Sequence, residues 1–169
     1  MHGGSSGSEF PERFTRLVDF YGEPGFRRIR AARVAVVGLG GVGSHAAVAL
    51  ARSGVGRLLL IDFDLVTQSS LNRAAAAGPA DVGRPKAEVL AGQIARTCPD
   101  TAIEIRQEFC DAKAAPALFD PRPDWVVDAV DGLNPKVDLL EFCVRGGLPV
   151  ASSMGASAHH DPTALCAGR

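Results

Sequence analysis

Residues 34–44 read Val-Ala-Val-Val-Gly-Leu-Gly-Gly-Val-Gly-Ser, an apolar run that breaks into closely spaced glycines. Gly38, Gly40 and Gly43 have the G-x-G-x-x-G spacing, which permits a tight turn and a close approach of the backbone to phosphate. The first turn of a following helix would present free N–H groups to an anion. The stretch therefore predicts a strand, a phosphate-binding loop and a helix, and taken alone it favours NAD or FAD.

Outward from this loop, strand-like and helix-like segments alternate along the chain. We expect strands at 33–37, 57–62, 101–106, 125–130 and 149–152, with helices at 42–52, 85–97 and 135–145. Such alternation predicts an α/β fold with a doubly wound, Rossmann-like, mostly parallel sheet and helices on both faces. Apolar residues at near-helical spacing before the first strand add an N-terminal helical arm, interrupted at 22–25. Ligands of such sheets bind beyond the carboxyl ends of the strands, so we expect one crevice there.

The composition is that of an ordinary globular domain. The chain has 169 residues, 46% hydrophobic and 22% charged, so we expect residues 11–169 to form one domain. Residues 1–10 read as a flexible tail or the remnant of an added sequence. The formal net charge of −1 gives no global field that would attract nucleic acid. No run approaches the ~18–20 apolar residues of a membrane span and no signal peptide is recognisable, so we expect a cytoplasmic protein.

The cysteines and histidines give no metal or redox site. Cys98, Cys110, Cys143 and Cys166 are scattered without a C-x-x-C pair, which argues against a zinc knuckle, a thioredoxin-like site and a disulfide framework. None of them is assigned as a nucleophile. His159-His160-Asp161 looks like a metal fragment, but adjacent residues of an extended segment point to opposite sides, and we interpret it as a polar loop.

The residues that follow the second strand separate ATP from NAD. Asp62 ends that strand about 20 residues after the glycine loop, where a carboxylate can accept hydrogen bonds from the ribose hydroxyls of either nucleotide. Soon afterwards comes Ser70-Leu71-Asn72-Arg73. A dehydrogenase has no reason to place serine, asparagine and arginine together, whereas a site that cleaves ATP does, so this segment favours ATP.

The chain resembles the ubiquitin-activating-like (ThiF/MoeB/HesA) adenylating superfamily. Its matching motifs are the glycine loop from Gly38 to Ser44, Asp62-Phe63-Asp64, Ser70-Leu71-Asn72-Arg73, Gly83-Arg84-Pro85-Lys86 and Asp128-Ala129-Val130-Asp131. In that family a substrate carboxylate attacks the α-phosphate of ATP and pyrophosphate leaves. The resemblance therefore implies ATP and Mg²⁺ as cofactors and an adenylation reaction.

The resemblance also implies roles for individual residues. Lys86 would contact the phosphates, Arg73 with Asn72 would bind the triphosphate, and Asp131 would meet Mg²⁺ and the nucleotide. Arg16, in Arg13-Phe14-Thr15-Arg16, would reach across a homodimer to the ATP of the partner. The expected catalytic residues are Arg16, Arg73, Lys86 and Asp131. The expected nucleotide-binding residues are Gly38, Gly40, Gly41, Gly43, Ser44, Asp62, Asp64, Ser70, Asn72, Arg73, Lys86 and Asp131. Asp128 could equally brace the loop or touch the ligand.

Three further stretches, 16–23, 128–136 and 155–163, resemble the branch of tRNA threonylcarbamoyladenosine dehydratases. That branch activates the carboxylate of a threonylcarbamoyl group on adenosine in tRNA, after which internal attack closes a ring with loss of water. The substrate carries its own nucleophile, so no enzyme thiol is obligatory. The implied partners are tRNA, a second copy in a homodimer and a sulfur-transfer protein.

Other interpretations stay open at this point. One is adenylation of the C-terminus of a ubiquitin-like sulfur-carrier protein, although members of that type commonly carry C-x-x-C zinc pairs, which this chain lacks. The others are an NAD-dependent oxidoreductase and a nucleotide-binding module without catalysis. The family domain continues beyond the strand near Val150, so we expect a C-terminally truncated member. Ala74 departs from the family, where glutamine is common after the arginine.

Overall fold

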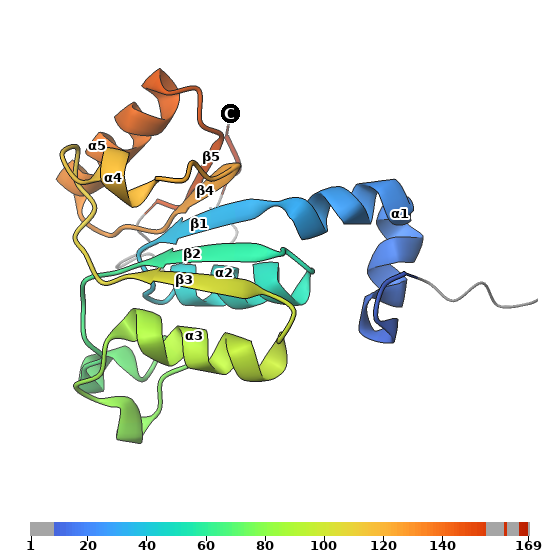
Figure 1. Ribbon diagram of the computed structural model, residues 1–169. Helices are drawn as coiled ribbons and strands as arrows, with labels where there is room; N and C mark the ends of the chain where they lie inside the picture. The colour runs from blue at the N-terminus through green and yellow to red at the C-terminus, as the bar shows by residue number, and fades with distance from the viewer. Residues whose placement is uncertain (1–8, 155–160, 162–165, 169) are drawn as a thin grey trace, which may run out of the picture.

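The computed structural model describes residues 9–154, 161 and 166–168, and its centre is a five-stranded parallel sheet in the order β3-β2-β1-β4-β5 (Figure 1). The strands are β1 Arg33–Val37, β2 Arg57–Ile61, β3 Ala102–Arg106, β4 Trp125–Asp128 and β5 Val150–Ser152. The helices are α1 Thr15–Ala31, α2 Gly43–Arg52, α3 Lys86–Thr97, α4 Ala115–Leu118 and α5 Leu133–Arg145. Each expected strand and helix is present, and the predicted fold class is confirmed. The four-residue helix α4 was not expected, because so short a segment carries no helical period.

The central strands are buried on both faces because helices cover both sides of the sheet. Val34 and Val36 of β1 belong to the core cluster that β1 and β2 form with α2 and α3. Ala35 and Val37, which alternate with them, belong to the cluster formed with α4 and α5. Figure 1 shows α3 below the sheet as drawn and α5 above it. This two-sided burial explains why β1 reads as a continuous apolar run rather than an alternating one.

The N-terminal arm packs against the amino-terminal end of the sheet, at the right of Figure 1. Helix α1 is kinked at Gly22, whose φ is 68°, as the predicted interruption requires. The buried ring of Phe26 contacts those of Phe10 and Phe14, with centroid distances of 4.8 and 5.1 Å. A Cβ on Gly54 would lie 2.8 Å from the Phe26 ring, so this glycine makes room for the arm. Of the predicted tail, residues 1–8 lie outside the described residues.

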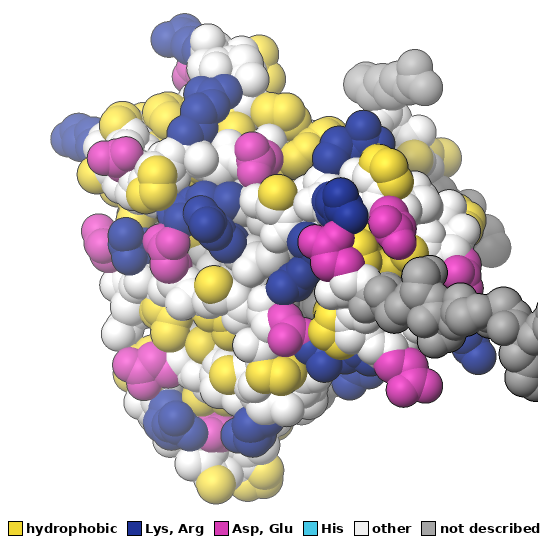
Figure 2. All heavy atoms as spheres, turned by 45° about the vertical axis from the view of Figure 1, so that its right-hand side comes forward, with side chains coloured by type: hydrophobic (Ala, Val, Ile, Leu, Met, Phe, Trp, Pro, Cys, Tyr) yellow, Lys and Arg dark blue, Asp and Glu magenta, His cyan; other side chains and the backbone are white. Residues whose placement is uncertain are grey.

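The face of the molecule seen in Figure 2 carries charges of both signs. On the face seen in Figure 2, lysine and arginine side chains are interspersed with aspartate and glutamate. Among the described residues, no helix is both long and apolar enough to cross a membrane.

Candidate functional site

The glycine loop connects β1 to α2, and its glycines are required by close contacts. Gly38 has a φ of +83°, and a Cβ there would lie 2.7 Å from the Ala129 carbonyl oxygen. A Cβ on Gly43 would lie only 1.8 Å from the Gly38 carbonyl oxygen. Gly43 therefore lets the first turn of α2 pack directly on the loop, which leaves the N-terminus of that helix at the end of β1.

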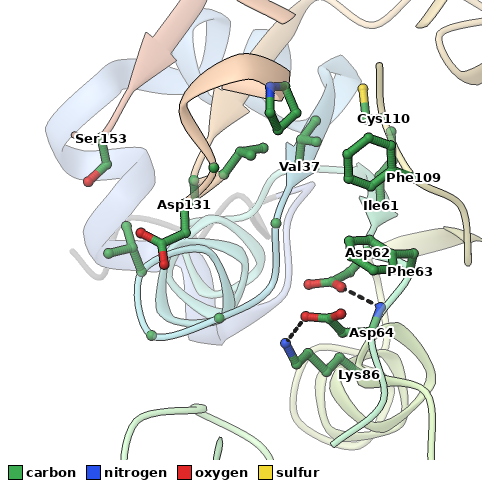
Figure 3. A pocket seen from close by; sticks show the side chains of 18 of the residues that line it. Val37, Ile61, Asp62, Phe63, Asp64, Lys86, Phe109, Cys110, Asp131 and Ser153 are labelled. Carbon is green, nitrogen blue, oxygen red and sulfur yellow. Dashed lines mark hydrogen bonds and ion pairs between the residues drawn. The ribbon is translucent and has the colours of Figure 1, made fainter. Parts of the chain in front are cut away.

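A cavity of about 640 Å³ opens beside this loop, at the carboxyl ends of β1, β2 and β4 (Figure 3). The structure brings eight of the expected site residues to its wall: Gly38, Gly40, Gly41, Asp62, Asp64, Arg73, Lys86 and Asp131. The predicted crevice is therefore present. It lies next to the point where the strand order reverses between β1 and β4, the usual ligand position in a doubly wound sheet.

Asp62 joins the glycine loop to the segment after β2. One of its oxygens, Oδ2, accepts the Leu39 N–H at 2.6 Å, and Oδ1 accepts the Asp64 N–H at 2.8 Å. The side chain is buried and still reaches the cavity wall. Because each carboxylate oxygen has two acceptor positions, Asp62 can hold the loop and also accept a hydrogen bond from a ligand hydroxyl.

Lys86 contributes an ammonium group to the cavity wall. It is the first residue of α3, and its Nζ donates to Asp64 Oδ2 at 2.6 Å. The Lys86 side chain is 13% exposed, whereas that of Asp64 is 45% exposed. Asp64 therefore holds the lysine at the cavity wall, as Figure 3 shows.

Arg73 lies over the glycine loop from the long connection between β2 and α3. A Cβ on Gly41 would lie 3.2 Å from Arg73 Cδ, so the arginine stem packs on that glycine. Two residues of α2 hold the segment in place. Ser44 Oγ accepts the Ala75 N–H at 3.0 Å, and His45 Nε2 lies 3.1 Å from the Arg73 carbonyl oxygen, to which it donates.

Asp131 follows β4 and lies across the cavity from Lys86 (Figure 3). Its side chain is exposed. Asp128, by contrast, is fully buried and is absent from the described lining of the cavity. Of the two roles open for Asp128, bracing the loop is the one seen, because its Oδ1 accepts the Val130 N–H at 3.0 Å.

Five further expected residues lie outside the described lining of the cavity. Gly43 and Ser44 pack α2 onto the loop, since Ser44 Oγ also donates to the Gly40 carbonyl oxygen at 2.6 Å. Ser70 is buried, and its Oγ accepts the Thr67 N–H in the turn that precedes Arg73. Asn72 accepts from Arg73 Nη1 at 3.2 Å. Arg16 lies on the arm, at the opposite end of the sheet in Figure 1, so its predicted role requires a second copy.

Sequence reasoning missed the apolar side of the cavity. Phe63 and Phe109 form an edge-to-face pair with centroids 5.1 Å apart, and both line the wall next to Cys110. Phe109 comes from the connection after β3, where nothing in the local pattern pointed to the site. The one available signal was that β2 and β3 are each followed, within three residues, by a phenylalanine in a segment that also carries polar residues.

Cys110 faces this cavity but is a poor nucleophile. Burial raises the pKa of its thiol to about 12, and the nearby Cys143, also buried, has a pKa raised to about 11. A thiol with such a pKa stays protonated near neutral pH. That no cysteine is a catalytic nucleophile remains a prediction. The predicted polar loop at His159-His160 lies outside the described residues.

The arrangement suits a nucleotide with several phosphates. The glycine loop lines one side of the cavity together with the cations of Arg73 and Lys86. The carboxylate of Asp62 lies at the end of β2, and two phenylalanine rings form an apolar wall. No group of three or more His, Cys, Asp or Glu that could hold a metal occurs in the described part of the chain. Asp131 fits Mg²⁺ in another way, because that ion commonly binds through one or two carboxylates together with substrate phosphates.

The sequence of this chain is similar to one family model and to enzymes of two kinds. The sequence model of the ThiF family matches residues 13–167. The tRNA threonylcarbamoyladenosine dehydratase of Bacillus subtilis is 39% identical over 89% of this chain and 59% of its own length. The molybdopterin-synthase adenylyltransferase of Escherichia coli is 35% identical over 81% of this chain and 53% of its own length.

A solved structure matches as well. The crystal structure of the Escherichia coli tRNA N6-threonylcarbamoyladenosine dehydratase in complex with ATP superposes with a TM-score of 0.85 at 36% identity. The match covers 89% of this chain and 62% of that one. The chain spans between 37% and 60% of the length of the first curated relatives it matches.

Proposed function

Because this chain belongs to the ThiF family, we propose that it forms the ATP-binding part of an enzyme that activates a carboxylate by adenylation. The observation that carries the proposal is that the glycine loop, Asp62, Arg73, Lys86 and Asp131 line one cavity. The substrate we propose is the threonylcarbamoyl group of adenosine in tRNA, the substrate named for relatives 36–40% identical to this chain.

The chemistry follows from the weakness of a carboxylate as an electrophile. In the proposed reaction the carboxylate attacks the α-phosphorus of ATP and pyrophosphate leaves; an internal nucleophile of the substrate then displaces AMP, which carries away one carboxyl oxygen. The net change in the nucleoside is loss of water. A substrate with its own nucleophile needs no thiol from the enzyme, and the raised pKa of Cys110 is compatible with that.

The residues of the cavity would share the work of binding and charge stabilisation. Lys86 and Arg73 would bind the phosphates and stabilise the charge that grows on the departing pyrophosphate. Asp62 would fix the ribose, and the N–H groups of the glycine loop would hold phosphate oxygens. Asp131 would hold Mg²⁺ against the phosphates. The aromatic pair Phe63 and Phe109 would offer an apolar wall to the base.

A second candidate function is adenylation of the C-terminus of a ubiquitin-like sulfur-carrier protein. It is favoured by the 35% identity with a molybdopterin-synthase adenylyltransferase. Both functions use the same activation of a carboxylate and differ only in the acceptor. A homodimer in which Arg16 reaches the partner's cavity, a sulfur-transfer partner and a cytoplasmic location remain predictions.

The decisive experiment is nucleoside mass spectrometry of tRNA that carries threonylcarbamoyladenosine. After incubation with the protein, ATP and Mg²⁺, we expect a nucleoside lighter by one water. The matched control replaces ATP by an analogue with a methylene group between the α- and β-phosphorus atoms, which cannot release pyrophosphate.

The alternatives give different outcomes. Exchange of pyrophosphate into ATP that depends on a carrier protein rather than on tRNA would favour the second function. ATP binding without exchange in either case would indicate a binding module. A melting temperature raised by NADH and unaffected by ATP with Mg²⁺ would contradict both adenylation functions.

A further inference from the structure

A buried ion pair lies directly behind the cavity wall that carries Asp131. Lys136 Nζ donates to Asp128 Oδ2 at 2.6 Å, and the two side chains are 5% and 0% exposed. Lys136 lies in the first turns of α5, and Asp128 is the last residue of β4. Neither side chain belongs to the described lining of the cavity, so the pair does not itself contact a ligand there.

The pair connects three backbone segments that meet at the cavity. Asp128 Oδ1 accepts the N–H of Val130, in the loop that carries Asp131. Lys136 Nζ also donates to the Ser153 carbonyl oxygen at 2.9 Å, and Ser153 lines the cavity beyond the end of β5. Asp128 Oδ2 accepts a further hydrogen bond from Ser152 Oγ at 2.5 Å. One ammonium group and one carboxylate thus fix the ends of β4 and β5 relative to α5.

Backbone hydrogen bonds fix the two ends of this loop, and among those of the described residues none holds Asp131 at its tip. The loop from Ala129 to Gly132 is only four residues long, and Asp131 at its tip is exposed. The N–H of Ala129 bonds to the Val37 carbonyl oxygen at 2.9 Å, and the N–H of Lys136 bonds to the Gly132 carbonyl oxygen at 3.1 Å, which fixes the start and the end of the loop but not its tip. A buried charge is retained only where a partner neutralises it, so the Lys136 and Asp128 side chains must occupy one arrangement together. That arrangement determines the direction in which the loop leaves β4.

We propose that Lys136 and Asp128 are positioning residues, whose buried ion pair holds the Asp131 loop and the Ser153 segment in the geometry that binds the Mg²⁺ complex of ATP. This proposal rests on the proposed function, because it assigns Asp131 to the metal–nucleotide complex. The pair acts through the backbone and takes no part in proton transfer or bond making.

The test compares two variants in which the pair is removed in different ways. Lys136→Met leaves Asp128 buried and unpaired, so we expect a marked loss of stability. The double variant Asp128→Leu with Lys136→Met replaces both charges by apolar side chains of similar volume, and such replacements are often tolerated. We expect its melting temperature to return toward that of the wild type. The dissociation constant of ATP with Mg²⁺ should nevertheless stay raised by about tenfold, as for other residues that orient a metal ligand.

Two readouts separate positioning from stability. The first is amide hydrogen exchange of the ligand-free protein, in which Val130 and Asp131 should exchange faster than in the wild type while amides of β1 keep their protection. The second is the ratio of ATP affinities with and without Mg²⁺, which should fall in the double variant. A purely structural pair would leave the exchange of Asp131 and the affinity ratio unchanged once stability is restored, whereas the exchange of Val130 rises in either case because Asp128→Leu removes the acceptor of its N–H.

The matched control is a second ion pair in the same sheet, at the other end of the strands. Arg33, the first residue of β1, has an 8% exposed side chain and bonds to both carboxylate oxygens of Glu104, with Nη2 at 2.9 Å from Oε2. Arg33→Met should lower the melting temperature and leave ATP affinity and the exchange of Val130 unchanged. Measurements should be made well below the melting temperature of the least stable variant.

The outcomes distinguish the two proposals. If the wild type binds ATP with Mg²⁺ and the double variant binds it equally well, the positioning role is wrong and the proposed function stands. If Arg33→Met weakens ATP binding as much as the double variant does, general stability explains the effect and the positioning role is again wrong. If the wild type does not bind ATP, the proposed function fails, and the role assigned to Lys136 and Asp128 fails with it.

Discussion

The two ends of the parallel sheet use the same structural devices for different purposes. At the amino-terminal end, Gly54 accommodates the Phe26 ring, and Gly56 approaches the backbone of Arg30 so closely that a side chain there would collide with it. At the carboxyl-terminal end, Gly38 and Gly43 approach neighbouring backbone just as closely. There, however, the result is a cavity of about 640 Å³ beside the loop. Close backbone packing therefore positions the arm at one end of the sheet and shapes the cavity beside the glycine loop at the other.

The charged groups differ between the ends in the same way. Arg33, at the amino-terminal end of β1, pairs with Glu104 of β3, and neither belongs to the described lining of the cavity. Lys86 and Asp64 lie in the cavity wall, and Lys136 and Asp128 lie behind it. Parallel strands bring their carboxyl ends and the following helix N-termini to one edge, so the anion-binding groups of the sheet gather there. The topology therefore places the cavity proposed to bind a nucleotide at the carboxyl-terminal end of the sheet.

The largest expected effects come from the glycines that bring backbones together. Gly43→Ala and Gly56→Ala each place a Cβ 1.8 Å from a carbonyl oxygen, of Gly38 and Arg30 respectively. We expect each to lower the free energy of unfolding by about 4 kcal/mol or more, measured by urea denaturation. Gly92→Ala in α3 is the control, because no heavy atom of the described residues lies within 4 Å of its added Cβ. It should stabilise by about 0.5–1 kcal/mol. A well-tolerated Gly56→Ala would break the equivalence of the two ends.

The next largest effect should separate function from stability at the carboxyl-terminal end. Lys86→Ala removes the ammonium group that would contact the phosphates, so pyrophosphate exchange should fall about 100-fold or more. The melting temperature should change by only a few degrees, because Asp64, its partner, is 45% exposed. Arg84→Ala is the matched control, because Arg84 stands two residues before Lys86 and forms an ion pair with Asp81 outside the described lining of the cavity. Unchanged exchange in Lys86→Ala would remove the assigned role of this lysine.

A smaller effect is expected for the ion pair at the amino-terminal end. The hydrogen bonds and charge of Arg33 hold the pKa of the Glu104 carboxyl below its ordinary value. A carboxyl whose pKa is lower in the folded state stabilises the fold above its unfolded pKa, and that stability is lost as the pH falls through the folded pKa. Glu104→Gln should therefore weaken the dependence of the free energy of unfolding on pH below about pH 5. The change should be less than about 1 kcal/mol, because Glu104 is 40% exposed. Its ATP affinity at pH 7.5 should equal that of the wild type.

The smallest effect on turnover is expected for Cys110. Although this residue lines the cavity, burial keeps its thiol protonated, so Cys110→Ala should change pyrophosphate exchange less than about twofold. An alkylating reagent at pH 8 should modify the exposed Cys166 before Cys110, as peptide mass spectrometry would show. The thiols of Cys110 and Cys143 ionise only in the unfolded chain just above pH 9, so stability should decline there as the pH rises. Loss of exchange in Cys110→Ala would show that a catalytic thiol had been overlooked.

Much of the molecule was predictable because its signals are local. The glycine spacing from Gly38 to Gly43 predicted the β1–α2 unit, since only glycine tolerates the approach that a side chain would block. Continuous apolar runs such as that of β1 predicted strands buried on both faces. Asp62, Arg73, Lys86 and Asp131 were identified in advance because they stand in motifs with a known order, and the strand topology brings them to one cavity.

The remaining features depend on contacts between distant segments. Phe109 reaches Phe63 only because β3 pairs with β2 in parallel, which brings two strand ends to the same edge. Lys136 meets Ser153 only because β5 lies beside β4. The sequence by itself determined the elements, their order and the polar residues expected at the site, because these follow from spacing along the chain. The tertiary structure alone decided which side chains face the cavity and which stand behind it, because burial and hydrogen-bond partners arise only when the strands are paired.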